Sequence, residues 1–255
     1  MKNIRLLSGV ILLAAVSACN KYDHDYRRPD VDPMQSTGGN AATIMGSSLA
    51  KDANGIVNLV ADVTLDAQSM VSAHSACGTI KSDSTSKQSA AGASTTYNYV
   101  TKSNLTVLCN SSNQADSALN VATYTGTFSN ASLTSSNSGS STFNIGGILA
   151  AATNYTVDGE YKRTGNYQYN TGAKNTTTSS TDIVLNKLLV SKPYRGIVGG
   201  TATFTITGTN STSTTASGNY SYTGTLTFNN TNYAQLTLNG TNYKVNLITG
   251  AVTAA

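Results

Sequence analysis

Carboxylates, which most acid–base chemistry needs in pairs, are scarce in this 255-residue chain, in which charged residues make up only 11%. Glu160 is the only glutamate, and Asp158 stands two positions before it. On a regular strand these two side chains would face the same way, as an acid and a base or a calcium-binding pair would require. Gly159 between them instead favours a solvated turn. Asp182 is the third carboxylate that could serve as an acid or a base.

Motifs that carry known catalytic or metal chemistry are missing from the sequence. It contains no G-x-S-x-G turn, no phosphate-binding P-loop, no H-E-x-x-H pair and no calcium-loop spacing. It has no C-x-x-C, and its only histidines are His24 and His74, which falls short of a four-ligand zinc site. We therefore predict no catalytic residue, no metal site and no cofactor.

The N-terminus has the pattern of an export signal. Lys2 and Arg5 precede an apolar stretch, residues 6–16, that is too short to span a bilayer as a helix. The stretch ends in Val16-Ser17-Ala18-Cys19, which resembles the lipobox of bacterial lipoproteins. The resemblance implies that residues 1–18 are a cleaved signal peptide and that acyl chains on Cys19 anchor the mature chain to a membrane. The alternative is an ordinary secretory signal peptide that happens to contain a cysteine, in which case Cys19 carries no lipid.

The chain has three cysteines, an odd number for an exported protein. If Cys19 carries lipid, Cys77 and Cys109 remain as an even pair, and we predict a disulfide bond between them. On the chain-entropy model, closing a loop of roughly 33 residues would stabilise the fold by about 3–4 kcal/mol. Two buried free thiols are the alternative.

Residues 19–47 show no hydrophobic periodicity, and prolines and a Gly-Gly pair interrupt them, so we predict a disordered tether. Directly behind Cys19 stands Asn20-Lys21-Tyr22-Asp23-His24-Asp25. Although a tyrosine and a histidine interrupt it, this segment resembles the acidic signal that sends lipoproteins of Bacteroidetes-type bacteria to the cell surface. The resemblance implies an outer-membrane lipoprotein, with the cell surface favoured over the periplasmic side. A solvated linker is the alternative.

The first structured element is predicted over residues 48–76. Apolar residues recur there at three- and four-residue spacing, which is typical of one face of a helix. They are Ile56, Leu59, Val60, Val63, Ala67, Met70 and Val71. Gly55 lies near the start of this segment, and Leu65 lies off the stripe.

From Cys77 the apolar period changes from about 3.6 to 2, and residues 77–255 are predicted to form an antiparallel β domain. The clearest strands are three at the C-terminus, where Asn239-Gly240 supplies a type I′ hairpin turn. Eight upstream candidates bring the number to about eleven strands. They are residues 95–101, 104–109, 119–128, 140–149, 154–164, 166–171, 181–190 and 201–208.

These elements predict a mainly β fold. We expect a large, curled antiparallel meander sheet of about eleven strands, with one N-terminal helix packed on it. A β-sandwich is the alternative. Strands and helices do not alternate along the sequence, which argues against a parallel α/β sheet.

Two groups of residues could bind a ligand on such a sheet. The chain has 14 tyrosines, which could serve as stacking platforms for sugars, although tyrosine alternating on a strand is more often part of the core. Lys187, Lys192 and Arg195 with Tyr194 could form a basic patch. Because the net charge is only +4, the patch is too dilute for nucleic acid, and we expect no nucleic-acid partner.

Two further resemblances concern modification and family. Asp83-Ser84-Thr85 and Asp116-Ser117-Ala118 resemble the O-glycosylation pattern of Bacteroidetes-type bacteria, which implies Ser84 and Ser117 as acceptors.

The order of parts along the chain is similar to that of a family of uncharacterised lipoproteins of these bacteria. The parts are a helical segment, Cys77-Gly78-Thr79-Ile80, a second cysteine and Asn154-Tyr155-Thr156-Val157-Asp158-Gly159. The chain departs from that family by Ser-Asn runs after Cys109. The resemblance implies architecture and location, and no activity.

We expect from these observations a non-enzymatic, outer-membrane-anchored protein that binds a glycan or an envelope protein. A structural envelope spacer is the alternative. A surface polysaccharide hydrolase that uses Asp158, Glu160 or Asp182 is a weaker hypothesis.

Overall fold

The structure is a computed structural model that describes residues 37–172, 174–211 and 218–255. All of them belong to one unit, which spans Asp32–Ala255. The predicted signal peptide, the lipidation site Cys19 and the acidic segment behind it lie outside the described residues.

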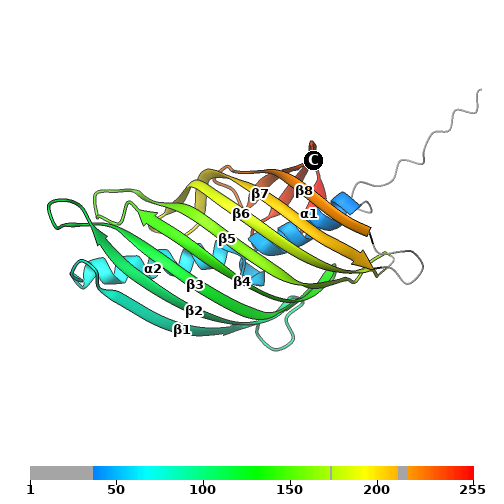
Figure 1. The fold of residues 1–255 in the computed structure, drawn as a ribbon, viewed down its shortest axis with the longest axis horizontal. Helices are drawn as coiled ribbons and strands as arrows, with labels where there is room; N and C mark the ends of the chain where they lie inside the picture. Colours follow the sequence, from blue (N-terminus) through cyan, green and yellow to red (C-terminus); the bar gives the residue numbers. More distant parts are fainter. Residues whose placement is uncertain (1–36, 173, 212–217) are drawn as a thin grey trace, which may run out of the picture. The chain divides into compact units, whose positions relative to one another are not determined.

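Eleven strands form one antiparallel sheet in which every strand pairs with its neighbours in sequence, from β1 at one edge to β11 at the other (Figure 1). The predicted mainly β meander is therefore confirmed. The strands are β1 (Ile80–Gln88), β2 (Thr96–Cys109), β3 (Ala115–Ser129), β4 (Leu133–Gly146), β5 (Asn154–Tyr169), β6 (Thr176–Ser191), β7 (Ile197–Ser211), β8 (Gly218–Phe228), β9 (Tyr233–Leu238), β10 (Thr241–Asn246) and β11 (Val252–Ala254).

The predicted number of strands is right, but the predicted boundaries differ from those in the structure. The candidates 95–101 and 104–109 are one strand, β2, and the candidates 154–164 and 166–171 are one strand, β5. The strands β1 and β11 were not predicted. All nine residues of β1 are exposed or half-buried, so it lacks the apolar alternation that marks the other strands. The Asn239-Gly240 turn is confirmed, because both residues have positive φ and connect the paired residues Leu238 and Thr241.

Two helices lie on one side of the sheet (Figure 1). They are α1 (Thr37–Leu49) and α2 (Ile56–Ser72), joined through the short 3-10 helix η2 (Lys51–Ala53). The helix α1 approaches β8 to β11, whereas α2 approaches β2, β3 and β5. Residues 94–95 before β2, residues 249–251 before β11 and Val252, the first residue of β11, line one pocket together with α1. The sheet therefore curls until its two ends approach the same helix.

The helix α1 corrects the predicted tether, because residues 37–47 are helical rather than disordered. It also corrects the prediction of a single helix. The sequence TGGNAATIMGSSL has weak helix formers and no charged residue, so local propensity does not reveal it. Tertiary packing supplies the stability: Ala41, Ala42, Ile44 and Met45 are buried. A side chain at Gly46 would lie 2.3 Å from the carbonyl oxygen of Gly250, so the glycine permits this close approach.

The helix α2 follows the predicted apolar stripe. Its buried residues include Ile56, Leu59, Val60, Val63, Ala67 and Met70. Leu65, which lies off the stripe, is 57% exposed. Gly55, the residue that interrupted the pattern, is the N-cap of this helix.

The inner face of the sheet, defined as the face that packs on α1 and α2, pairs large rings with glycines. Tyr124 stands directly opposite Gly139 across β3 and β4, and a Cβ at Gly139 would lie 2.3 Å from the Tyr124 hydroxyl oxygen. Three further pairs have the same arrangement, namely Tyr99 with Gly126, Phe204 with Gly224 and Tyr220 with Gly208. Because the ring of one strand covers the glycine of the next, the inner face stays close-packed where the sheet curves.

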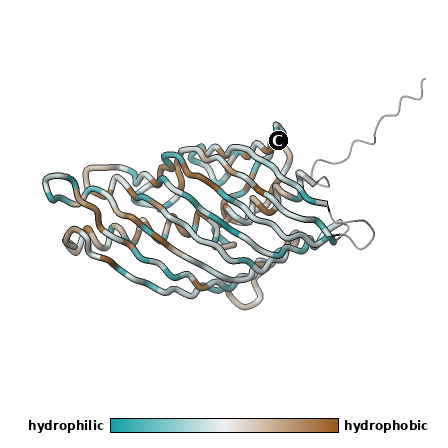
Figure 2. The backbone as a smooth tube through the Cα atoms, viewed as in Figure 1, coloured by the Kyte–Doolittle hydropathy of each residue, from teal (hydrophilic) through white to brown (hydrophobic). Residues whose placement is uncertain are grey.

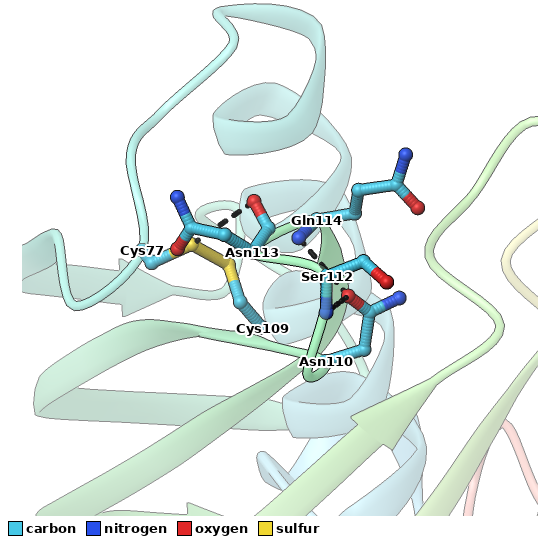
Figure 3. The surroundings of a disulfide bond; sticks show 6 residues. All are labelled: Cys77, Cys109, Asn110, Ser112, Asn113 and Gln114. Atoms are coloured by element: carbon cyan, nitrogen blue, oxygen red, sulfur yellow. Dashed lines mark hydrogen bonds between the residues drawn. A yellow bond between two sulfur atoms is a disulfide. The ribbon is translucent and has the colours of Figure 1, made fainter.

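The predicted disulfide bond joins Cys77 and Cys109, with a Cα–Cα distance of 5.6 Å (Figure 3). It ties Cys77, three residues before β1 begins, to the last residue of β2. The tight turn after Cys109 is held by Asn110, whose Oδ1 accepts hydrogen bonds from the backbone N–H of Ser112 at 2.9 Å and Gln114 at 3.1 Å. The bond thus fixes the edge hairpin at one end.

Two ion pairs connect the same edge strand to α2. Lys87 of β1 lies 2.6 Å from Asp62, and Lys81 lies 2.5 Å from Asp66. Lys87 also donates a hydrogen bond of 3.2 Å to Asn58. These contacts hold the solvent side of α2 against β1.

Candidate functional site

The outer face of the sheet, opposite the helices, carries two rows of uncharged polar side chains that run across the strands. The first row crosses six strands through directly paired residues and consists only of hydroxyl side chains: Thr125, Ser138, Thr164, Ser180, Thr207 and Ser221. The second row lies two residues along each strand and adds amides: Thr127, Ser136, Asn166, Thr178, Thr209 and Asn219. We call these two sets the hydroxyl rows.

A shallow groove of about 820 Å³ follows the hydroxyl rows from β3 to β7. Its lining contains threonine, serine, asparagine and glycine, and no charged or aromatic residue. Along the strands in this region hydrophobic residues are interspersed with hydrophilic ones and do not form a continuous run (Figure 2). The groove therefore offers many hydrogen-bond donors and acceptors but neither a charge nor a stacking platform.

The spacing of these side chains follows from the sheet itself. Adjacent strands lie about 4.8 Å apart, and residues on one face recur about 6.7 Å apart along a strand. A hydroxyl group thus recurs at every strand of the first row. The arrangement is a two-dimensional grid of neutral polar groups, which suits a ligand with regularly repeated hydroxyl groups.

Three charged residues lie beside the groove. Lys162 and Asp182 stand opposite each other in the row next to Thr164 and Ser180, and Glu160 stands one row further away. Lys162 lies 2.8 Å from Glu160 and 3.7 Å from Asp182. Burial, and after it the nearby Glu160 carboxylate, raise the pKa of Asp182. The Glu160 hydrogen bond is the main cause that raises the pKa of Lys162. Because the lysine is shared, both carboxylates are held as an ion cluster on an open face.

The structure does not bring Asp158 and Glu160 together as a pair. Asp158 accepts a hydrogen bond of 2.8 Å from the backbone N–H of Lys187, which has a positive φ of 49° in a bulge of β6. The predicted solvated turn is wrong, because Gly159 lies inside β5 with φ of 137°. A Cβ there would lie 2.0 Å from the Thr142 carbonyl oxygen. The glycine thus serves close strand packing rather than a turn.

The tyrosines belong mostly to the core, as the commoner interpretation of their alternation predicted. Those that are almost fully buried are Tyr99, Tyr124, Tyr155, Tyr161, Tyr167, Tyr169 and Tyr243. Among the described residues only Tyr194 and Tyr233 are strongly exposed, at 87% and 40%. Lys244 lies 4.1 Å from the ring centre of Tyr233, so that ring is already covered by a cation. Sugar stacking on an array of tyrosines is therefore not supported.

The predicted basic patch is only partly assembled. Lys192 and Arg195 approach the Tyr155 ring, at 5.0 and 5.6 Å from its centre. Arg195 also donates a hydrogen bond to Gln68 of α2. Lys187 is held separately by the contact of its backbone with Asp158. The cations at this end of the sheet thus fasten α2 and the β6–β7 turn.

The two predicted O-glycosylation sites lie on the first strands. Ser84 is an exposed residue of β1, and Ser117 is a half-buried residue of β3. Both remain predictions. Within the described ranges, no group of three metal-ligating side chains is found, and no helix there is long and apolar enough to cross a membrane.

The sequence analysis predicted neither the hydroxyl rows nor the burial of Arg163. Each strand shows threonine or serine alternating with apolar residues, but only the register decides which hydroxyl groups become neighbours. Arg163 stands in the alternating series Tyr161, Arg163, Gly165 and Tyr167, and this parity was the available signal that it points to the inner face. No family model, curated protein or solved structure matches the chain.

Proposed function

We propose that this protein is a lipid-anchored, non-enzymatic protein of the outer membrane that binds a neutral polysaccharide in the groove along the hydroxyl rows. The observation that supports the ligand class is the uncharged grid itself, since its lining contains no acidic or basic residue. Neutral sugars carry many hydroxyl groups, which pair with serine, threonine and asparagine side chains. An acidic glycan would find no cation inside the groove.

The dimensions of the grid favour a chain that runs across the strands. The strand spacing of about 4.8 Å is comparable to the length of one pyranose ring in an extended polysaccharide. On the convex side the side-chain tips diverge slightly, which brings the spacing closer to that length. Successive sugars could then contact Thr125, Ser138, Thr164, Ser180 and Thr207 in turn.

The anchor and location rest on the N-terminal sequence. The lipobox-like Val16-Ser17-Ala18-Cys19 supports lipidation of Cys19. The first described residue, Thr37, follows Cys19 by 18 positions, a chain that reaches at most about 60 Å when extended. Surface display is the favoured orientation, because Asn20-Lys21-Tyr22-Asp23-His24-Asp25 resembles the acidic signal for export to the cell surface.

Binding to a panel of soluble polysaccharides tests the proposal. We expect the full-length protein in detergent to be retarded in native gels that contain a neutral polymer among dextran, laminarin and mannan, with little dependence on salt. Polygalacturonate and heparin should not retard it. Retardation by the acidic polymers alone, or by none of the panel, would contradict the proposal.

The hydrolase hypothesis makes a different prediction. It would use Glu160 and Asp182, the two carboxylates beside Lys162 at the border of the groove. Release of reducing ends from a bound polymer, abolished in Glu160→Gln or Asp182→Asn, would favour it. We expect no such release.

A further inference from the structure

Arg163 of β5 is completely buried, with 0% of its surface exposed. Its side chain lies on the inner face, against the last turn of α1. Nη1 donates a hydrogen bond of 2.8 Å to the carbonyl oxygen of Ser47. Nη2 donates to the Tyr99 hydroxyl group at 2.5 Å, and the Tyr99 ring centre lies 5.7 Å from the guanidinium carbon. The Nε–H group has no hydrogen-bond partner.

No carboxylate in the described part of the chain pairs with this charge. None of the ion pairs found in residues 37–172, 174–211 and 218–255 includes Arg163. Burial raises the pKa values of Tyr99, Tyr124 and Tyr167, so these phenols stay neutral. The Ser47 carbonyl group contributes only part of the negative end of the α1 dipole, which amounts to about half a charge. A buried guanidinium without a full negative charge is strongly unfavourable.

The neighbours of Arg163 add further unpaired groups. The hydroxyl groups of Ser141, Tyr161, Tyr167 and Thr181 are buried without a hydrogen-bond partner. Ser141 stands directly opposite Tyr161, and Thr181 directly opposite Arg163. Since Tyr161 and Arg163 are two residues apart on one face of β5, these groups are neighbours on the inner face.

The acceptors in this neighbourhood are all neutral. A guanidinium can only donate, whereas each hydroxyl group can donate its proton and can also accept. The Oδ1 atom of Asn137 is a further buried acceptor without a hydrogen-bond partner. The Tyr99 hydroxyl oxygen already accepts hydrogen bonds from Arg163 and, at 3.0 Å, from Asn137. The Tyr99 hydroxyl proton therefore points away from both of these donors. The missing component is an acceptor that carries a negative charge.

We propose that a small monovalent anion, with chloride as the simplest case, binds beside Arg163 on the inner face of the sheet. The Nε–H group of Arg163 and the hydroxyl groups of Tyr161, Ser141 and Thr181 donate to it. A monatomic anion accepts from all of these directions without geometric demands of its own. A water molecule would satisfy the hydroxyl groups but would leave the charge. This site lies on the opposite face from the groove and does not depend on the proposed polysaccharide.

Because the anion neutralises the group that holds the last turn of α1, its binding stabilises the folded protein. We therefore propose to measure thermal unfolding of the full-length protein in detergent, by tyrosine circular dichroism, in chloride and in gluconate at equal ionic strength. We expect Tm to rise by about 5 °C between chloride-free buffer and about 150 mM chloride. Bromide should act like chloride, whereas gluconate is too large to enter.

Two variants locate the effect. In Arg163→Met the chloride dependence should vanish, whereas in Arg195→Met, which removes a cation from the β6–β7 turn, it should persist. If Arg163→Met fails to fold, crystals of the unaltered protein soaked in bromide replace it, and we expect an anomalous peak within hydrogen-bond distance of Arg163 Nε. Equal Tm values in chloride and gluconate, a chloride effect that survives in Arg163→Met, or a bromide peak elsewhere only would overturn the proposal.

Discussion

The two faces of the strands β3 to β7 have opposite chemistry although their residues alternate in one sequence. On the inner face, tyrosine rings cover glycines, and the buried Arg163 reaches α1. On the outer face, the hydroxyl rows border a groove without charge. Inner residues touch the next strand's glycines or the helices, whereas outer residues face solvent. Successive residues of one strand therefore differ in role. The inner-facing residues stabilise the fold, and the outer-facing residues are available to bind a ligand.

The largest effect that tests this contrast comes from neighbouring residues of β4. A Cβ in Gly139→Ala would lie 2.1 Å from the Lys162 carbonyl oxygen and 2.3 Å from the Tyr124 hydroxyl oxygen. We expect a loss of about 4 kcal/mol in the free energy of unfolding, because backbone of the next strand must move. Ser138→Ala, one position earlier on the outer face, should change it by less than about 0.5 kcal/mol. Urea denaturation of both variants measures the difference, and similar values would refute the division between the faces.

The disulfide bond should contribute slightly less than the inner packing and should be independent of either face. Replacing both cysteines, in Cys77→Ala with Cys109→Ala, frees the loop between them and is expected to cost about 3–4 kcal/mol. Combined with Ser138→Ala, the two losses should simply add. Urea denaturation under oxidising conditions checks this. A loss below about 1 kcal/mol would mean that the β1 edge contributes little to the cooperative fold.

A smaller and pH-dependent effect is expected at the inner face of β1. Burial raises the pKa of Asp62, and the hydrogen bond from Lys87 opposes that rise. In Lys87→Met the pKa of Asp62 in the folded state should rise further above its unfolded value, so the added cost appears as pH increases through that folded pKa. We expect a loss of about 1 kcal/mol at pH 7 that shrinks as the pH falls through the folded pKa of Asp62 in the variant and is gone by about pH 4.

The matched control for this variant is Lys102→Met on β2. Lys102 lies on the outer face, where it lines a hollow with Ser84 and Asp83, and none of the ion pairs in the part of the chain that the structure describes involves it. Its substitution should leave the pH dependence of unfolding unchanged. A Lys87→Met loss that is constant from pH 3 to about pH 8 would show that Asp62 is not the responsible group.

The sequence predicts the fold class because alternation is strong where both faces have a defined environment. In β8, Tyr220, Tyr222, Leu226 and Phe228 alternate with hydroxyl residues, and the strand is found where the pattern places it. The strand β1 and the helix α1 were missed for the opposite reason. Polar β1 is held by a disulfide bond and ion pairs, and glycine-rich α1 by packing against the C-terminal strands, and neither force leaves a local pattern.

The groove along the hydroxyl rows could not be predicted from the sequence for a related reason. Long polar strands such as β4, with its run Thr134-Ser135-Ser136-Asn137-Ser138, give no indication of which residue faces which neighbour. Register is set by the turns and by the inner face, where glycines must meet rings. Thr164 and Ser180 become neighbours only because the two strands pair as they do. Lipidation of Cys19 and glycosylation of Ser84 and Ser117 stay predictions.

A small expected change in stability together with the largest expected change in binding tests the central claim most directly. The triple variant Ser138→Ala, Thr164→Val and Ser180→Ala removes three adjacent hydroxyl groups of the first row. The control Thr203→Val, Thr205→Val and Thr223→Val removes three from outer positions of β7 and β8 outside the groove lining. Retardation by the bound neutral polysaccharide and urea denaturation are measured on the same samples.

We predict that the groove variant loses at least about tenfold in affinity, or about 1.4 kcal/mol, while its free energy of unfolding stays within about 1 kcal/mol of the unaltered protein. The control should keep both properties. Equal affinity of the groove variant and the control would contradict the assignment of binding to the hydroxyl rows.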